Sequence, residues 1–122
     1  MRDSNPQKVQ LGGEESPTLD WVFELLSSRR RRYALYYLCQ CENGVATVEE
    51  VVDHLLVLEG GAAEAADLKL KRQSITTSLK HVHLLKMVDA NVLEYDEQSG
   101  MIRYWGQPTL DEWLEHAYHK EQ

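Results

Sequence analysis

The side chains best suited to chemistry lie in one basic stretch, residues 69–91. It holds five Lys or Arg residues and a single acid, Asp89, near its end. Residues 42–67, just before it, hold seven acids and no Lys or Arg. In a chain of net charge −7, a local concentration of positive charge acts within about one Debye length, roughly 8–10 Å in ordinary salt. Such a stretch suits the phosphate backbone of nucleic acid, and we predict that it binds double-stranded DNA.

Helical periodicity divides this stretch into an inward and an outward face. With Ile75 taken as inward, Leu68, Leu79 and Val82 share its side. Small polar and basic side chains lie opposite, where they can approach a base-pair edge. We predict phosphate contacts from Lys69, Lys71, Arg72 and Lys80, and base-edge contacts from Gln73, Ser74, Thr76 and Thr77. The alternative is an ordinary solvated face of a helix.

The apolar phase of the same stretch shifts after His81. Leu84, Met87 and Val88 fall on the side that was polar before. One straight helix cannot bury both apolar sets in one direction, so we expect a kink or break near 82–83 and a short second helix ending at 89 or 90. Asn91 then suits a left-handed residue just after that helix.

The flanking segments supply the elements that must position this helix. Periodicity, caps and turn residues predict helices over 18–27, 28–41, 48–58 and 109–119, a short strand at 45–46, a linker at 62–68, and a hairpin with strands at 92–96 and 101–105. Thr18, Ser28, Thr47 and Thr109 are the expected N-caps. The fold class predicted is mainly α with a β-hairpin wing, a winged helix-turn-helix. Its expected parts are a flexible N-terminal tail (1–17), the DNA-binding domain (18–105) and a C-terminal helix for dimerisation (106–122).

Several segments resemble known regulators. "HLLKMVDANVLEYD" and "GMIRYW" look like the end of the recognition helix and the wing of ArsR-like and PadR-like bacterial and archaeal regulators, with Asn91 in place of the usual Gly. "SSRRRRYALYYL" and "ATVEEVVDHL" are similar to a haloarchaeal family of short winged-helix proteins. The resemblance implies a homodimeric DNA-binding transcription regulator of the oxidative stress response. Within it, Arg103, Gln98 and Ser99 would serve the wing, although acids at 94, 96 and 97 oppose a contact with DNA.

The first and last predicted helices carry more apolar surface than a chain of 122 residues can easily bury. A two-fold dimer would cover it and would match two DNA half-sites one helical turn apart. The residues predicted at this interface are Trp21, Leu110, Trp113, Leu114 and Ala117.

The sequence also bears on other functions. The sequence holds no Gly-rich phosphate loop and no nucleophile motif, so we expect neither an enzyme nor a cofactor. Cys39 and Cys41 read as structural, with redox sensing as the alternative. His116 and His119 have spacing that a metal-sensing repressor could use. A winged-helix interaction module that does not bind DNA is the main rival. No apolar run is long enough for a membrane span and no signal peptide is recognisable, which favours the cytoplasm.

Overall fold

The computed structural model describes residues 18–60 and 64–121, so the predicted tail at 1–17 lies outside the described residues. The elements in chain order are α1 (Asp20–Leu26), α2 (Arg29–Gln40), a 3-10 turn η1 (Glu42–Gly44), β2 (Val45–Thr47), α3 (Val48–Gly60), α4 (Ala65–Ser78), a π-helical turn η2 (Leu79–His83), α5 (Leu84–Asp89), β3 (Leu93–Asp96), β4 (Met101–Tyr104) and α6 (Pro108–Glu121). The predicted fold class is confirmed: the chain is mainly helical, with a small antiparallel sheet in a winged-helix arrangement. Within the described ranges, no helix combines the length and apolar character needed to cross a membrane.

The three strands form one antiparallel sheet in the order β2-β4-β3. Ile102 at its centre faces Ala46 on one side and Tyr95 on the other. The backbone N–H of Val48 donates to the carbonyl of Gly100 at 2.8 Å. This bond ties the first residue of α3 to the hairpin turn, so the hairpin is anchored to the helical body and not only to its own two strands.

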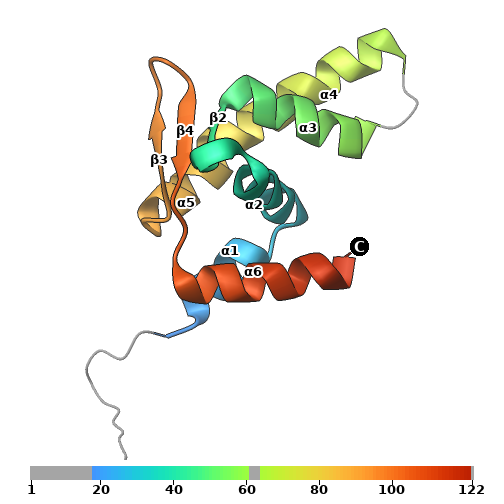
Figure 1. The fold of residues 1–122 in the computed structure, drawn as a ribbon. Coiled ribbons are helices and arrows are strands. Elements are labelled where there is room, and N and C mark those ends of the chain that lie inside the picture. The colour runs from blue at the N-terminus through green and yellow to red at the C-terminus, as the bar shows by residue number, and fades with distance from the viewer. Residues whose placement is uncertain (1–17, 61–63, 122) are drawn as a thin grey trace, which may run out of the picture.

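Figure 1 shows how the helices are arranged around this sheet. The hairpin stands along one side of the body, and α3 and α4 extend toward the opposite side. Helix α6 crosses below α1 and α2, at the end away from the hairpin turn. The core between these layers is fully apolar at its centre and includes Leu35, Leu55, Ile75 and Leu110, each 0% exposed.

The π-helical turn η2 resolves the phase shift of the basic stretch. The N–H of Leu84 donates to the carbonyl of Leu79, five residues earlier, where an α-helix would use a four-residue step. Leu79 and Leu84 are both 0% exposed. The extra residue in this turn rotates the helix, so that Ile75 and Met87 can face the same core. An irregularity is thus present at the expected place, but the helix continues through it to Asp89 without a break, and Val82 and Val88 are exposed and not buried.

A buried arginine joins α1, α2 and this π turn. Arg31 is 3% exposed, and its guanidinium donates to the carbonyls of Leu25 at 2.8 Å and Glu24 at 2.6 Å. Its Nη1 lies 3.1 Å from Nδ1 of His83. Because a guanidinium has only donors, this nitrogen of His83 must be the unprotonated acceptor. Burial, with help from the nearby arginines, lowers the pKa of His83 to about 4.

The caps confirm some expected helix ends and correct others. Ser28 accepts from Arg31 N, and Thr47 and Glu50 form the reciprocal capping box. Asn91 has φ 61°, and the amides of 91 and 92 bond to the carbonyls of Val88 and Met87.

Two predicted N-caps are wrong, and two helices begin earlier than expected. The last helix begins at Pro108, a residue suited to a first helical position, and the Gln107 side chain accepts from Leu110 N at 2.9 Å in place of Thr109. The first helix begins at Asp20, with Leu19 and not Thr18 at its cap. The expected linker at 62–68 overlaps α4, which begins at Ala65 because its Ala-rich sequence favours a helix.

The His83 contact predicts an acid-dependent loss of stability. Between about pH 6.5 and pH 4 the unfolded chain binds a proton at His83 that the folded chain does not bind, so the free energy of unfolding falls as the pH falls, by about 1–3 kcal/mol over the full window. In denaturant unfolding from about pH 7 to about pH 4, His83→Gln should lose less stability than the natural chain, because its amide stays neutral. His81→Gln, at an exposed neighbour, is the control. Equal pH slopes for His83→Gln and the natural chain would contradict this.

Candidate nucleic-acid interface

A groove of about 410 Å³ lies between α4, the first turn of α3 and the hairpin turn. We call it the helix–wing groove. Five of the residues predicted to contact DNA line it: Arg72, Thr76, Lys80, Gln98 and Ser99. These residues come from two segments that are far apart in sequence, and the fold brings them to one place.

The walls of the groove are held in fixed positions. Thr47 and Val48, at the beginning of α3, are bonded to Glu50 and to the hairpin turn. Tyr95 lines the groove from β3, on the edge of the sheet. Sequence reasoning missed Thr47, Glu49 and Tyr95 as lining residues. The alternation of the strand and the capping box were visible in the sequence, but which element would face them was not.

The charges in the groove are mixed. Arg72 forms an ion pair with Asp53 on α3. Lys80 has no acidic partner within 4 Å in the part of the chain that the structure describes, although Glu49 and Glu97 line the same groove. The groove is therefore not strongly positive by itself. Its positive charge depends on Lys80 and on whether Arg72 remains paired with Asp53.

The other predicted residues of α4 divide into two groups. Lys69, Gln73, Ser74 and Thr77 are exposed and do not line the groove, so they form a polar helix surface beside it. Lys71 points elsewhere, with its Nζ 3.5 Å from Glu59 Oε1. Glu59 also accepts two hydrogen bonds from Arg30, which lower the pKa of its carboxyl. Lys71 thus belongs to a charged cluster that joins α4 to Glu59 of α3 and Arg30 of α2.

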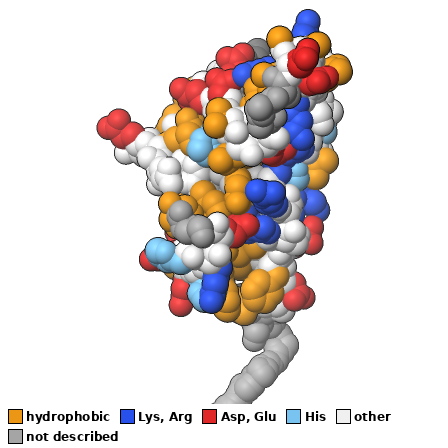
Figure 2. Space-filling view, turned by 90° about the vertical axis from the view of Figure 1, so that its right-hand side faces the viewer, with side chains coloured by type: hydrophobic (Ala, Val, Ile, Leu, Met, Phe, Trp, Pro, Cys, Tyr) orange, Lys and Arg blue, Asp and Glu red, His pale blue; other side chains and the backbone are white. Residues whose placement is uncertain are grey.

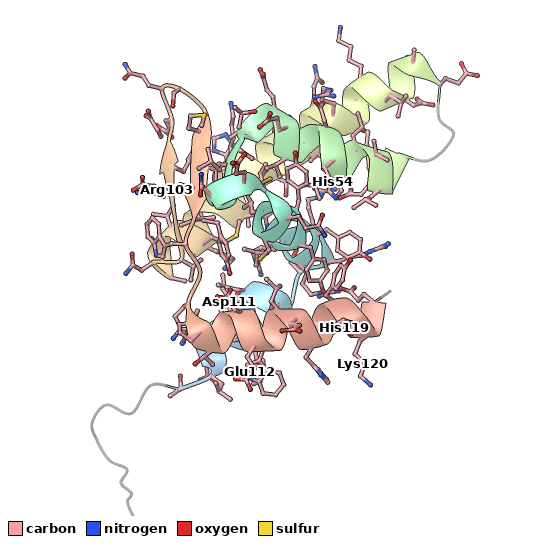
Figure 3. All side chains as sticks on the ribbon, viewed as in Figure 1. His54, Arg103, Asp111, Glu112, His119 and Lys120 are labelled. Atoms are coloured by element: carbon pink, nitrogen blue, oxygen red, sulfur yellow. The ribbon has the colours of Figure 1, made fainter. Side chains whose placement is uncertain are left out.

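The wing offers fewer available groups than predicted. The Ser99 hydroxyl donates to Asp96 Oδ2 at 2.8 Å and accepts from Met101 N, so it is already used inside the turn. Gln98 is exposed beside it. Arg103 pairs with Glu94 across the sheet at 3.4 Å and lies low on the hairpin, away from its tip (Figure 3).

The four consecutive arginines at 29–32 all interact with other residues of the same chain. Arg30 pairs with Glu59, Arg32 pairs with Glu121 and also donates to the carbonyl of Leu26, and Arg29 lies over the ring of Tyr33. The face in Figure 2 shows the result: basic side chains alternate with acidic and apolar ones and form no surface of a single sign.

The predicted dimer residues also divide by burial. Leu110 and Leu114 are 0% and 3% exposed, so their surface is already used within the chain. Trp21 and Ala117 are partly buried. Trp113 is 36% exposed and packs edge-to-face on Phe23 of α1, which is 47% exposed. The apolar surface left on α1 and α6 is therefore centred on Phe23 and Trp113.

The structure gives little support to redox sensing by the cysteines or to metal binding by the histidines of α6. Cys39 and Cys41 are free thiols, Cys39 exposed and Cys41 half-buried, and partial desolvation raises the pKa of both, that of Cys39 to about 11. His119 lies 3.8 Å from Glu115 on the surface of α6. Within 18–60 and 64–121, no three His, Cys, Asp or Glu residues are grouped so as to hold a metal ion.

The raised pKa of Cys39 predicts slow alkylation. Only the thiolate is nucleophilic, and a shift from the usual value of 9.0 to about 11 lowers the thiolate fraction at neutral pH about 100-fold. In a Cys41→Ala variant, iodoacetamide should modify Cys39 one to two orders of magnitude more slowly, roughly, than it modifies free cysteine. Mass spectrometry against time gives the rate, and denatured protein is the control. A native rate equal to the denatured rate would contradict the expectation.

Comparison with known proteins gives one family. Residues 23–103 match the family described as Domain of unknown function (DUF7344). The match runs from α1 to β4 and covers the whole helix–wing groove, whereas α6 lies beyond it. No curated protein and no solved structure matches the chain. Since the matched residues make up more than half of the chain, this protein belongs to the DUF7344 family.

Proposed function

We propose that the protein is a sequence-specific DNA-binding transcription regulator that acts as a homodimer. The observation that carries this proposal is the helix–wing groove, because one helix with an exposed polar face and one hairpin turn open to the same side of the molecule. In winged helices a helix of this kind enters the major groove while the hairpin flanks it. Lys80 and Arg72 would meet phosphates, and Gln73, Thr76 and Thr77 would meet base edges.

The homodimer is supported by the apolar surface around Phe23 and Trp113. It lies on α1 and α6, at the end of the body away from the hairpin turn (Figure 1). Two copies joined there would leave both helix–wing grooves open. A two-fold dimer suits two half-sites in the DNA, since the symmetry of the protein then matches that of the site.

A second candidate is a winged-helix interaction module that binds a basic protein partner and not DNA. The acids in and around the groove favour this second candidate. Asp53 neutralises the charge of Arg72, and Glu49 and Glu97 line the same groove as Lys80 and reduce its positive potential. The net charge of −7 adds to the repulsion of DNA at long range.

A role in the oxidative stress response rests on the resemblance to haloarchaeal regulators. The raised pKa values of Cys39 and Cys41 disfavour rapid oxidation of either thiol, because oxidation needs the thiolate, although Cys39 is exposed to solvent. We therefore propose that any response to oxidant reaches the protein by a route other than these two cysteines.

The DNA proposal predicts two kinds of variant. Arg72→Ala and Lys80→Ala should weaken binding to all sequences and each reduce the slope of log K against log salt by about 1. Gln73→Ala and Thr77→Ala should lower discrimination between a sequence selected from a random pool and unrelated DNA, by about 1–3 kcal/mol. Fluorescence anisotropy over a salt series measures both.

Two further variants sharpen this experiment. Asp53→Asn frees Arg72 and removes a negative charge, so it should strengthen binding. Lys120→Ala removes one positive charge from the far end of α6 (Figure 3) and should leave binding unchanged. Denaturant unfolding checks that Arg72→Ala stays folded, because an exposed ion pair contributes only about 0–1 kcal/mol. No saturable binding at low salt, or an equal loss in Lys120→Ala, would reject DNA binding at this groove.

The homodimer predicts that a charge on the α1/α6 surface separates the copies. Phe23→Glu should shift sedimentation from a dimer to a monomer, because it places a carboxylate in an apolar contact. Leu85→Glu changes a leucine of similar exposure, 51%, on α5 and should leave the dimer intact. A monomeric natural chain at all concentrations, or a dimer that survives Phe23→Glu, would contradict this interface.

A further inference from the structure

A second hollow lies far from the helix–wing groove, between α2, the end of β4 and α6. Its volume is about 460 Å³, within the range of sites that bind small molecules. The walls are mainly aromatic and apolar, with Tyr36 from α2, Tyr104 from β4 and Tyr118 from α6. We call it the α2/α6 pocket.

Two carboxylates face this pocket from one side of α6. Asp111 and Glu115 are four residues apart, hence on one helical face, and both line the pocket. Asp111 Oδ1 accepts from the Tyr104 hydroxyl at 2.7 Å. Figure 3 shows Asp111 on the side of α6 toward α2, whereas its neighbour Glu112 points the other way. Asp111 is thus held in place by a neutral donor.

Few positively charged side chains lie near these two carboxylates. Among residues 18–60 and 64–121, neither has a Lys or Arg within 4 Å, and the one basic contact is the surface pair of Glu115 with His119 at 3.8 Å. The nearby arginine Arg32 is committed to Glu121 and Leu26. Negative charge beside the aromatic rings of Tyr36 and Tyr118, which meet edge-to-face at 5.1 Å, is complementary to a cation with an apolar body.

We propose that the α2/α6 pocket binds a small organic cation, an ammonium group attached to an aromatic or other compact apolar body. The ammonium group lies between Asp111 and Glu115, and the apolar body lies against the tyrosines. The pocket is separate from the surface proposed for dimerisation, because Trp113 lies on nearly the opposite face of α6 from Asp111 and Glu115.

The pocket lies against the end of the hairpin strand β4, so a bound ligand could influence the wing. Tyr104 is the last residue of β4. A Cβ at Gly44, just before β2, would lie 2.2 Å from the Tyr104 carbonyl oxygen. The beginning of β2 and the end of β4 are therefore in close backbone contact. A ligand in the pocket therefore lies against the end of β4, and a shift of the Tyr104 backbone would be passed to the wing. That consequence for DNA rests on the proposed function, whereas binding of the cation does not.

The test uses 2-phenylethylamine as the probe, with the natural chain in phosphate buffer at constant ionic strength. Two-dimensional amide NMR should show saturable shifts around Cys39, Tyr104 and Asp111, with a Kd on the order of 1 mM for so small a ligand. The similar-sized anion 3-phenylpropionate should produce no saturable shifts there, because the carboxylates repel it.

Matched variants separate the site from a general effect of charge. Asp111→Asn with Glu115→Gln should weaken binding of the probe about tenfold, and Asn still accepts from Tyr104. Glu112→Gln removes a carboxylate that points away and should bind as the natural chain does. Glu115→Gln alone, which leaves the Tyr104 contact intact, should also weaken binding and serves if the double variant does not fold. Absence of saturable shifts, equal binding of the anion, or an equal loss in Glu112→Gln would overturn the proposal. DNA is absent from these measurements, so their outcome is distinct from that of the DNA experiment.

Discussion

The arrangement of the helices depends on one buried charge, the guanidinium of Arg31. Removing a charge from water is costly unless every donor finds an acceptor. Here the acceptors are the carbonyls of Glu24 and Leu25 in the last turn of α1, the Ser27 hydroxyl and a ring nitrogen of His83. The negative end of the α1 dipole therefore faces the positive side chains at the beginning of α2, which offsets their unfavourable place at a helix N-terminus. The same guanidinium contacts the π turn through His83, and it thereby joins α1, α2 and the middle of the α4–α5 helical segment.

The apolar pattern of the sequence was sufficient to predict most of the fold. Ile75, Leu79, Leu84 and Met87 could not share one face of a straight helix, and the irregularity expected from them is present as the π turn of a helix that continues without a break. Local signals such as Thr47 with Glu50, or Asn91 after α5, also predicted the structure, because each needs only residues within one turn. Thr109 failed as a cap because Pro108 and Gln107, one and two residues earlier, satisfied the same requirement.

The candidate site was less predictable, because it depends on contacts between distant segments. The count of basic residues marked α4 correctly as the charged helix, but it could not show that Asp53 holds Arg72 or that Glu59 holds Lys71. Those acids lie 19 and 12 residues earlier, and only the packing of α3 on α4 brings them near. For the same reason the α2/α6 pocket had no signal in the sequence: Cys39, Tyr104 and Asp111 carry no shared spacing, and α6 must fold back across α2 before they meet.

The π turn also has a consequence for chain length. A turn closed by a five-residue step contains one residue more than the α-helical turn that could replace it. Loss of one residue from its exposed side, such as His81, would bring Leu84 to the position four residues after Leu79, and both leucines would stay on the core side. Elsewhere in α4 or α5 the same loss would rotate every later side chain by about 100° and expose the apolar face. Insertions and deletions are usually tolerated in loops. In this molecule one residue can also be lost from the π turn, in the middle of the longest continuous helical segment, and the later side chains still face the core.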